Sequence, residues 1–134
     1  MRLTATASYS GAGRRVLVCD DERNVVRLIQ VNLERQGHKV VCAYDGQEAV
    51  NLLETSGQPN QPKFDAVVLD VMMPKLDGME VLKWIRTHEH TKSLWVALML
   101  ARLQNAEVFE QYEYRADKYV VKPFDPADLF GLAR

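Results

Sequence analysis

Residues 64–78 read FDAVVLDVMMPKLDG, and they combine an apolar run, an acid and turn-forming residues in that order. The run at residues 64–69 is short and rich in valine, which is typical of a strand buried on both faces. Asp70 follows it directly, and Pro74 and Gly78 then predict a turn before a helix. The segment therefore predicts a buried strand that brings a carboxylate to its carboxyl end.

The same pattern recurs on both sides of this segment. Short apolar runs at residues 16–19, 39–44, 94–100 and 119–121 predict four more strands. Helical spacing or helix-favouring composition predicts helices at residues 22–36, around 49–53, after Gly78, at 106–114 and at 126–133. In the first helix the predicted apolar stripe consists of Val25, Leu28, Ile29 and Leu33. Residues 55–63, which contain a glycine and two prolines, predict an exposed loop. Because strand and helix alternate without hairpin signals, we expect one α/β domain with a parallel sheet and helices on both faces.

Composition limits the classes of function. The chain has 134 residues, 47% of them hydrophobic, and a formal net charge of −1, so nothing favours binding to nucleic acid or to an anionic membrane. No apolar run approaches the length of a membrane span. Residues 1–14 are predicted to be a disordered lead-in and residues 15–134 the folded domain. Cys19 and Cys42 form no CxxC motif, which fits reduced core thiols in a cytoplasmic protein.

Three acids lie at the predicted strand ends. Asp20 and Asp21 follow the first strand, and Asp70 follows the third. Ligands of open α/β sheets bind at the carboxyl ends of the strands, where these side chains converge if the two strands are neighbours. Carboxylates that close repel one another and need a proton or a cation between them. A hard divalent ion fits, and Mg²⁺ is favoured because it accepts a site of few carboxylates completed by water and phosphate oxygens.

Lys122 follows the fifth predicted strand and precedes Pro123, so its ammonium group can reach the same crevice and pair with an added anion. A single Asp after a strand is usually a turn former or a helix cap, and a loop lysine is usually solvated. Chance is a poor explanation, however, for an acid pair, a single acid and a lysine at three strand ends that the topology brings together.

At these residues the sequence resembles the receiver domains of two-component response regulators. The resemblance runs from about Val16 to Leu132 and rests on Asp20-Asp21, on LDVMMP at residues 69–74 with Asp77-Gly78 close behind, and on ADKYVVKPF at residues 116–124. It implies a flavodoxin-like fold, a doubly wound (βα)5 domain whose five parallel strands lie in the order 2-1-3-4-5.

The resemblance also implies roles for individual residues. Asp70 would be the phosphoacceptor, and Asp20, Asp21 and the backbone carbonyl of Met72 would join it in binding Mg²⁺. Lys122 would pair with the phosphoryl oxygens. The backbone N–H groups near Met72 and Ala101 would complete the phosphoryl site, and Tyr119 would report phosphorylation by rotating. No enzymatic activity is expected beyond self-phosphorylation and slow self-dephosphorylation.

Leu100 departs from the family, which places Thr or Ser at the end of the fourth strand. The hydroxyl there bonds the phosphoryl group and draws the following loop inward. No Ser or Thr occurs from Leu94 to Val121 as a substitute, and leucine cannot donate a hydrogen bond. We therefore expect phosphoacceptor chemistry to survive while the coupling to Tyr119 is weakened or altered.

Two other functions compete with a phosphorylatable receiver. A pseudo-receiver would bind a partner without phosphate control, which Leu100 favours and the intact charged residues oppose. A phosphatase of the haloacid-dehalogenase type would need a second acid two residues after its nucleophile, where this chain has Met72. The expected partners are a sensor histidine kinase or phosphotransfer protein and a downstream output domain or protein, and the state of assembly, monomer or homodimer, is left open.

Overall fold

The alternation of strands and helices expected from the sequence is present in the computed structural model, which describes residues 13–101 and 106–131. All four neighbouring strand pairs are parallel, and the strand order is β2-β1-β3-β4-β5. The strands are β1 (Arg15–Cys19), β2 (Lys39–Ala43), β3 (Ala66–Asp70), β4 (Trp95–Leu100) and β5 (Lys118–Val121). The helices are α1 (Arg23–Arg35), α2 (Gly46–Ser56), α3 (Gly78–Thr87), α4 (Ala106–Glu110) and α5 (Asp128–Gly131). The expected doubly wound α/β fold is confirmed.

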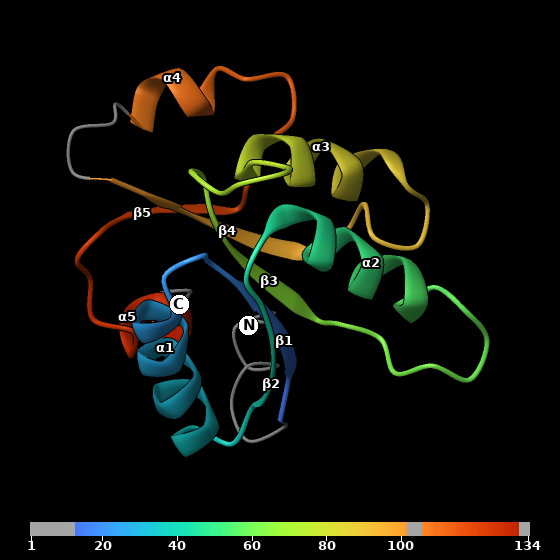
Figure 1. Ribbon diagram of the computed structural model, residues 1–134, viewed down its shortest axis with the longest axis horizontal. Coiled ribbons are helices and arrows are strands. Elements are labelled where there is room, and N and C mark those ends of the chain that lie inside the picture. Colours follow the sequence, from blue (N-terminus) through green and yellow to red (C-terminus); the bar gives the residue numbers. More distant parts are fainter. Residues whose placement is uncertain (1–12, 102–105, 132–134) are drawn as a thin grey trace.

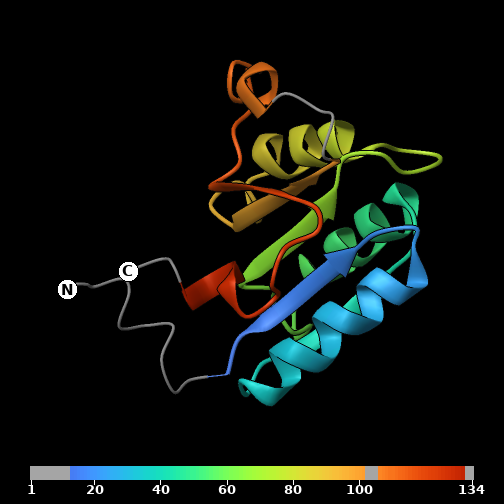
Figure 2. The same ribbon diagram turned by 90° about the vertical axis from the view of Figure 1, so that its left-hand side faces the viewer.

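The helices form a layer on each face of the sheet. Helices α1 and α5 lie next to each other on one face, and α2 and α3 cover the other (Figures 1 and 2). Helix α4 lies beyond α3, toward the β5 edge of the sheet (Figure 1). None of the helices in the described part of the chain has the length and apolar character that a membrane crossing requires.

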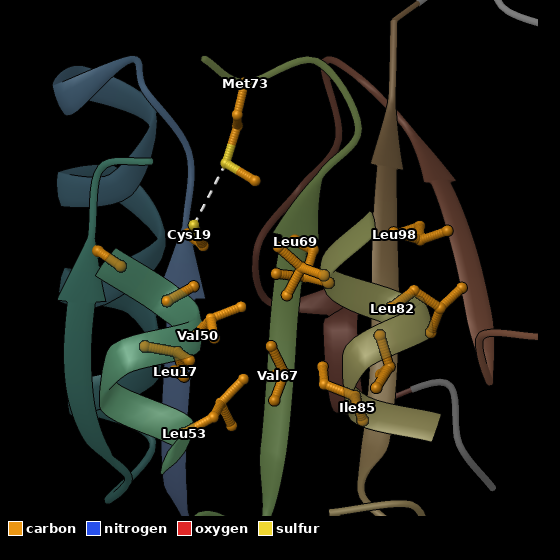
Figure 3. Packing of buried hydrophobic residues seen from close by; sticks show 14 of the residues in the cluster. Leu17, Cys19, Val50, Leu53, Val67, Leu69, Met73, Leu82, Ile85 and Leu98 are labelled. Carbon is orange, nitrogen blue, oxygen red and sulfur yellow. Dashed lines mark hydrogen bonds between the residues drawn. The ribbon is translucent and has the colours of Figure 1, made fainter. Parts of the chain in front are cut away.

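Two apolar clusters, one on each face, hold the layers to the sheet. The alternation of side chains along β3 sends Val67 and Leu69 toward α2 and α3, and Val68 toward α1 and α5. Figure 3 shows the first of these clusters, in which side chains of α2 and α3 meet those of the three central strands. Since both faces are covered, the strands can be apolar throughout, as the sequence pattern predicts.

Side-chain caps fix where two helices begin. Asp45 accepts a hydrogen bond from the backbone N–H of Glu48 at 2.8 Å and so caps α2. Asp77 caps α3 in a capping box: its carboxylate accepts from the N–H of Glu80, whose side chain accepts from the N–H of Asp77. Both caps lie at the edge of the sheet where the carboxyl ends of the strands gather, so they also fix the adjacent loops.

Several predicted boundaries were wrong. Helix α2 continues to Ser56, and the hydroxyls of Thr55 and Ser56 donate to carbonyls of the preceding turn. Helix α4 ends at Glu110 and does not reach position 114. Beyond it, Tyr112 and Tyr114 pack edge to face, 5.7 Å apart, against the core from a turn.

The predicted apolar stripe of α1 was wrong at two positions, because it included Leu28 and omitted Val26. Val26, Ile29 and Leu33 are buried, whereas Leu28 is 54% exposed. Apolar residues occupy more of the helix circumference than the sheet can cover, so spacing alone could not identify the buried ones. The side chain of Leu28 is therefore available for contacts outside the core.

The structure describes only part of the predicted chain ends, and it describes both cysteines. Most of the predicted lead-in and the end of the last predicted helix fall on residues 1–12 and 132–134, which lie outside the described residues. Arg14 is described, and its carbonyl accepts a hydrogen bond from the N–H of Lys39 at 2.8 Å. Cys19 and Cys42 are both free, as expected.

Replacing Arg86 with Ala should lower the free energy of unfolding by about 1 to 3 kcal/mol, because its guanidinium joins three segments of chain. It donates to the carbonyls of Arg115, Lys92 and Leu94 and pairs with Asp117 at 3.0 Å. Urea unfolding measures the loss, and Arg27→Ala on the exposed face of α1 is the matched control. Equal stability of the two variants would contradict this role of Arg86.

Candidate functional site

Three carboxylates meet where β1 and β3 end. Asp70 is the last residue of β3, and Asp20 and Asp21 follow the neighbouring β1. One oxygen from each of the three lies within 4.8 Å of the others. Asp20 is fully buried and Asp70 is 6% exposed, while Asp21 is open to solvent. The convergence expected from the sequence is therefore present.

Lys122, which follows β5, reaches into this cluster. Its Nζ lies 2.7 Å from Oδ2 of Asp20 and 3.2 Å from Oδ1 of Asp70. The backbone N–H of Lys122 donates to the carbonyl of Leu100 at 2.8 Å, and the peptide bond to Pro123 is cis. One ammonium group is thus shared by two buried carboxylates, whereas the sequence predicted only that Lys122 reaches this crevice to pair with an added anion.

The side chains of this cluster shift one another's pKa values. Burial and the adjacent charge of Asp20 raise the pKa of Asp70 to about 6, although Lys122 acts in the opposite direction. Burial also raises the pKa of Asp20 above its usual range, against the effect of Lys122. Burial works against the charge of Lys122, but hydrogen bonding to Asp20 and the charges of both carboxylates outweigh it and raise its pKa. One lysine therefore compensates the buried negative charge only in part.

The donor set fits a divalent cation. Oδ2 of Asp20 is buried and lies 2.7 Å from the ammonium group of Lys122, so a further lone pair of this oxygen is available to a cation. Three carboxylates with oxygens so close are the ligands that hard cations such as Mg²⁺ prefer. The same groups, with the lysine, could then hold a phosphoryl group in place of solvent ligands.

The loop from β3 to α3 is fixed by close backbone approaches. Gly78 donates its N–H to the carbonyl of Val71 at 2.8 Å, and a Cβ on it would lie 2.3 Å from the carbonyl oxygen of Asp70. The N–H of Val71 in turn donates to the carbonyl of Met99 on β4. This loop carries Met72, whose side chain is 64% exposed at the edge of the site. Its carbonyl remains a predicted ligand.

A cavity of about 670 Å³ opens next to the acid cluster. Asp21, Asp70 and Lys122 line one part of it, and Met72 and Ala101 lie on its wall. The rest is lined by apolar side chains of α1 and of the segment between β5 and α5: Val25, Leu28, Ile29, Pro123, Phe124 and Pro126. Charged and apolar side chains thus both line the cavity.

The two residues expected to form a switch, Leu100 and Tyr119, lie on the face of the sheet that α2 and α3 cover. Leu100 is fully buried and belongs to the apolar cluster that α2 and α3 cover, with Tyr119 packed against that cluster. The hydroxyl of Tyr119 accepts a hydrogen bond from the N–H of Ala116 at 3.1 Å. Leu100 is not among the described residues that line the cavity.

Sequence reasoning missed Glu22 as part of the site. Its carboxylate Oε1 accepts a hydrogen bond from Lys122 Nζ at 3.3 Å, so a third carboxylate contacts the same ammonium group. Glu22 is 65% exposed in that ion pair and lines the cavity. Its position directly after the acid pair was the available signal.

Comparison with known proteins places these features in a family. Residues 16–134 match the family model described as the response regulator receiver domain. The chain is 43% identical over 117 residues to the alkaline phosphatase synthesis transcriptional regulatory protein PhoP of Bacillus subtilis; the match covers 87% of this chain and 45% of PhoP. The chain thus spans about half the length of that curated relative.

Solved receiver structures have the same fold. The Francisella response regulator 1452 receiver domain is 30% identical, with a TM-score of 0.74 over 88% of this chain and 91% of that one. The phosphorylated cyanobacterial phytochrome response regulator RcpA is 29% identical, with a TM-score of 0.74 over 90% of this chain and 88% of that one. The match to the family model, over residues 16–134, includes the strand ends that carry the acid cluster.

Proposed function

We propose that this chain, which belongs to the response regulator receiver domain family of two-component systems, accepts a phosphoryl group on Asp70 with Mg²⁺ as cofactor. One observation carries the proposal: the nearly buried carboxylate of Asp70 lies beside Asp20 and 3.2 Å from the ammonium group of Lys122. A carboxylate that is held there can act as a nucleophile, and the surrounding charges can compensate those of an incoming phosphoryl group.

Each residue has a separate task in the proposed reaction. An oxygen of Asp70 attacks phosphorus, and the bond from phosphorus to the donor breaks, so that the donor leaves with the electron pair. Lys122 moves its ion pair from Asp70 to the phosphoryl oxygens, which keeps the ammonium group paired throughout. Asp20, Asp21 and Asp70, with the carbonyl of Met72, would hold Mg²⁺, which would supply positive charge that offsets the charge of the phosphoryl group. The backbone N–H groups near Met72 and Ala101 complete the phosphoryl site.

The proposed partners follow from family membership. The donor would be a sensor histidine kinase or a phosphotransfer protein in the cytoplasm, and the recipient of the signal an output domain or a separate protein. PhoP is a transcriptional regulatory protein, of which this chain matches less than half. We propose that the chain's own chemistry is limited to self-phosphorylation and slow self-dephosphorylation. A dehalogenase-type phosphatase is set aside, because residues 16–134 match the receiver family.

Incubation with acetyl phosphate tests the proposal by intact mass. With Mg²⁺ we expect the wild type to gain one phosphoryl group, and without Mg²⁺ we expect at least a tenfold slower gain. Asp70→Asn should gain none. Asp65→Asn is the matched control, because Asp65 precedes the same strand at its opposite end and is exposed. If the folded wild type gained no mass with Mg²⁺ present, the pseudo-receiver function would be favoured instead.

The coupling from Asp70 to Tyr119 should be weak in the wild type and stronger in Leu100→Thr. Leucine has no hydroxyl for the phosphoryl group, and the Tyr119 hydroxyl is already bonded to the N–H of Ala116. We expect phosphorylation to change the amide NMR shifts around Tyr119 at least twice as much in Leu100→Thr as in the wild type.

Leu98→Thr is the control for this comparison, since Leu98 is also fully buried in β4 and belongs to the same apolar cluster. Leu98→Thr introduces an equally buried hydroxyl into the same strand, two residues before position 100. Shift changes in the wild type as large as those in Leu100→Thr would contradict weakened coupling.

A further inference from the structure

The thiol of Cys19 lies against the thioether of Met73. The two sulfur atoms are 3.2 Å apart, and Figure 3 shows them facing each other where the apolar cluster meets the β3–α3 loop. Cys19 is fully buried and Met73 is 9% exposed. Burial raises the pKa of the thiol, so Cys19 keeps its proton and can donate it to the sulfur of Met73. The contact joins the strand end that carries Asp20 to the loop that follows Asp70.

Backbone hydrogen bonds attach the β3–α3 loop to the described structure at its two ends. At the start of the loop, Val71 bonds to β4 through its N–H and to α3 through its carbonyl. At the end, the carbonyl of Asp77 accepts a hydrogen bond from α3. Residues 72–76 form no backbone hydrogen bond with any other described part of the chain. Side chains must therefore determine where the carbonyl of Met72 lies.

Met73 is the buried anchor of this loop. Among the side chains of residues 72–76, all of which the structure describes, only that of Met73 is buried. Lys75 pairs with Asp45 at 3.5 Å but is 68% exposed, and surface pairs of this kind contribute little. The carbonyl of Met72 belongs to the planar peptide group that joins it to Met73, so a shift of the Met73 backbone also shifts that carbonyl.

Cys19 limits where the side chain of Met73 can settle. A methionine side chain is flexible and fits many arrangements, so packing alone fixes it poorly. The thiol gives its sulfur one partner at a fixed place, the last residue of β1. The same Sγ lies 3.4 Å from the carbonyl oxygen of Asp45, directly before α2, so Cys19 contacts the loops that follow both β2 and β3.

We propose that Cys19 and Met73 are positioning residues of the metal site, whose sulfur contact holds the β3–α3 loop so that the carbonyl of Met72 can bind Mg²⁺ together with the acid cluster. The inference rests on the proposed function, in which this carbonyl is a ligand. Neither side chain is itself a ligand. Both act through the peptide group between Met72 and Met73.

Mg²⁺ binding to the unphosphorylated protein, followed by amide NMR shifts, measures the effect without phosphoryl transfer. Groups that orient metal ligands are typically worth about ten- to hundredfold in metal affinity, and an anchor of one ligand among several predicts less, about fivefold weaker binding in Met73→Ala. Cys19→Ala should bind Mg²⁺ about threefold more weakly than the wild type. The double variant should bind about fivefold more weakly, rather than about fifteenfold, because both residues act through one contact.

Conservative and matched variants separate positioning from a loss of packing. Met73→Leu fills nearly the same volume with a stiffer side chain that needs no sulfur partner, so it should bind Mg²⁺ within about twofold of the wild type. Ile85→Ala removes a fully buried side chain from the same cluster, far from Met73 in Figure 3, and should lower stability without weakening Mg²⁺ binding. Cys42→Ala is the control for Cys19→Ala, because Cys42 packs against the cluster on the other face of the sheet.

Phosphorylation by acetyl phosphate gives a second readout. Met73→Ala should need about fivefold more Mg²⁺ than the wild type for its half-maximal rate, whereas its rate at saturating Mg²⁺ should stay within about twofold of the wild-type rate. A purely structural role would leave the half-saturating Mg²⁺ concentration of the folded protein unchanged. That result would contradict the inference.

The outcomes separate this inference from the proposed function. Unchanged Mg²⁺ affinity in folded Met73→Ala, with a wild type that is phosphorylated on Asp70, would overturn the inference and leave the proposed function standing. If Met73→Ala failed to fold, equal Mg²⁺ binding by Cys19→Ala and Cys42→Ala would overturn it in the same way. A wild type that neither bound Mg²⁺ nor gained a phosphoryl group would overturn both. Weaker Mg²⁺ binding in Met73→Ala and Cys19→Ala, in a protein that gained no phosphoryl group, would support the positioning role and overturn the proposed function.

Discussion

Metal-free Asp70→Asn should be more stable than the wild type near pH 7, by about 1 to 3 kcal/mol in free energy of unfolding. Asp70 is nearly buried and its pKa is raised to about 6. Ionisation of Asp70 near neutral pH therefore costs free energy in the folded protein but not in the unfolded chain, and this difference lowers the free energy of unfolding. An amide has nearly the same shape but no charge, so the substitution removes this cost together with the repulsion from Asp20.

The sign of the pH dependence follows from the same shift. Because the folded-state pKa of Asp70 lies above its unfolded value, its protonated form favours the folded state, and this contribution is complete below about pH 4. The contribution is lost as pH rises through about 6. The stability gain of Asp70→Asn should therefore be large near pH 7 and disappear near pH 4.

Urea unfolding in chelator at both pH values measures the gain, with Asp65→Asn as the control, because Asp65 is exposed and lies at the other end of β3. Added Mg²⁺ should stabilise the wild type more than Asp70→Asn and so narrow the difference. If metal-free Asp70→Asn were as stable as the wild type or less stable at pH 7, ionisation of Asp70 would not destabilise the folded protein, which would contradict this prediction.

Gly78→Ala should lower the free energy of unfolding by about 2 to 4 kcal/mol and slow phosphorylation of Asp70 at least tenfold. The added Cβ would lie 2.3 Å from the carbonyl oxygen of Asp70 and 2.8 Å from Cα of Val71. Both are backbone atoms of the strand end that places the phosphoacceptor, so relief of the clash must displace that carboxylate. Helix propensity alone predicts the opposite sign, since Ala normally stabilises a helix relative to Gly.

Gly57→Ala is the matched control for this substitution. A Cβ there would also meet atoms closer than 3.0 Å, but those atoms belong to the side chain of His90 and not to backbone, so the ring can shift at the cost of its 3.0 Å contact with the carbonyl of Leu53. We expect a change in stability of no more than about 1 kcal/mol and normal phosphorylation. Equal losses in the two variants would show that crowding at Gly78 has no particular connection with Asp70.

The apolar pattern predicted the strands and the acids at their ends, whereas the strand order came from the resemblance to receiver domains. Buried parallel strands must be apolar, so a charged residue directly after an apolar run marks the strand's end with little ambiguity. Asp20, Asp21 and Asp70 were found in this way, and Lys122 by its place after the last run. Topology then brought them together without information about any side chain.

What the sequence could not provide were features that depend on packing in three dimensions. Periodicity could not tell the buried Val26 from the exposed Leu28, because both lie in an apolar stretch of α1. The close approach of Gly78 to Asp70 involves only backbone atoms and leaves no pattern beyond a common turn residue. The contact of Glu22 with Lys122 depends on where the loop after β5 lies relative to α1.

Chemical identification of the phosphorylated residue tests the central claim most directly. An acyl phosphate can be reduced by borohydride, which converts the modified aspartate to homoserine, and peptide mass spectrometry then locates the change. After incubation with acetyl phosphate and Mg²⁺, the account predicts homoserine at position 70 and at no other aspartate. A stable phosphoryl group on another residue, or none on Asp70 of the folded protein, would contradict it.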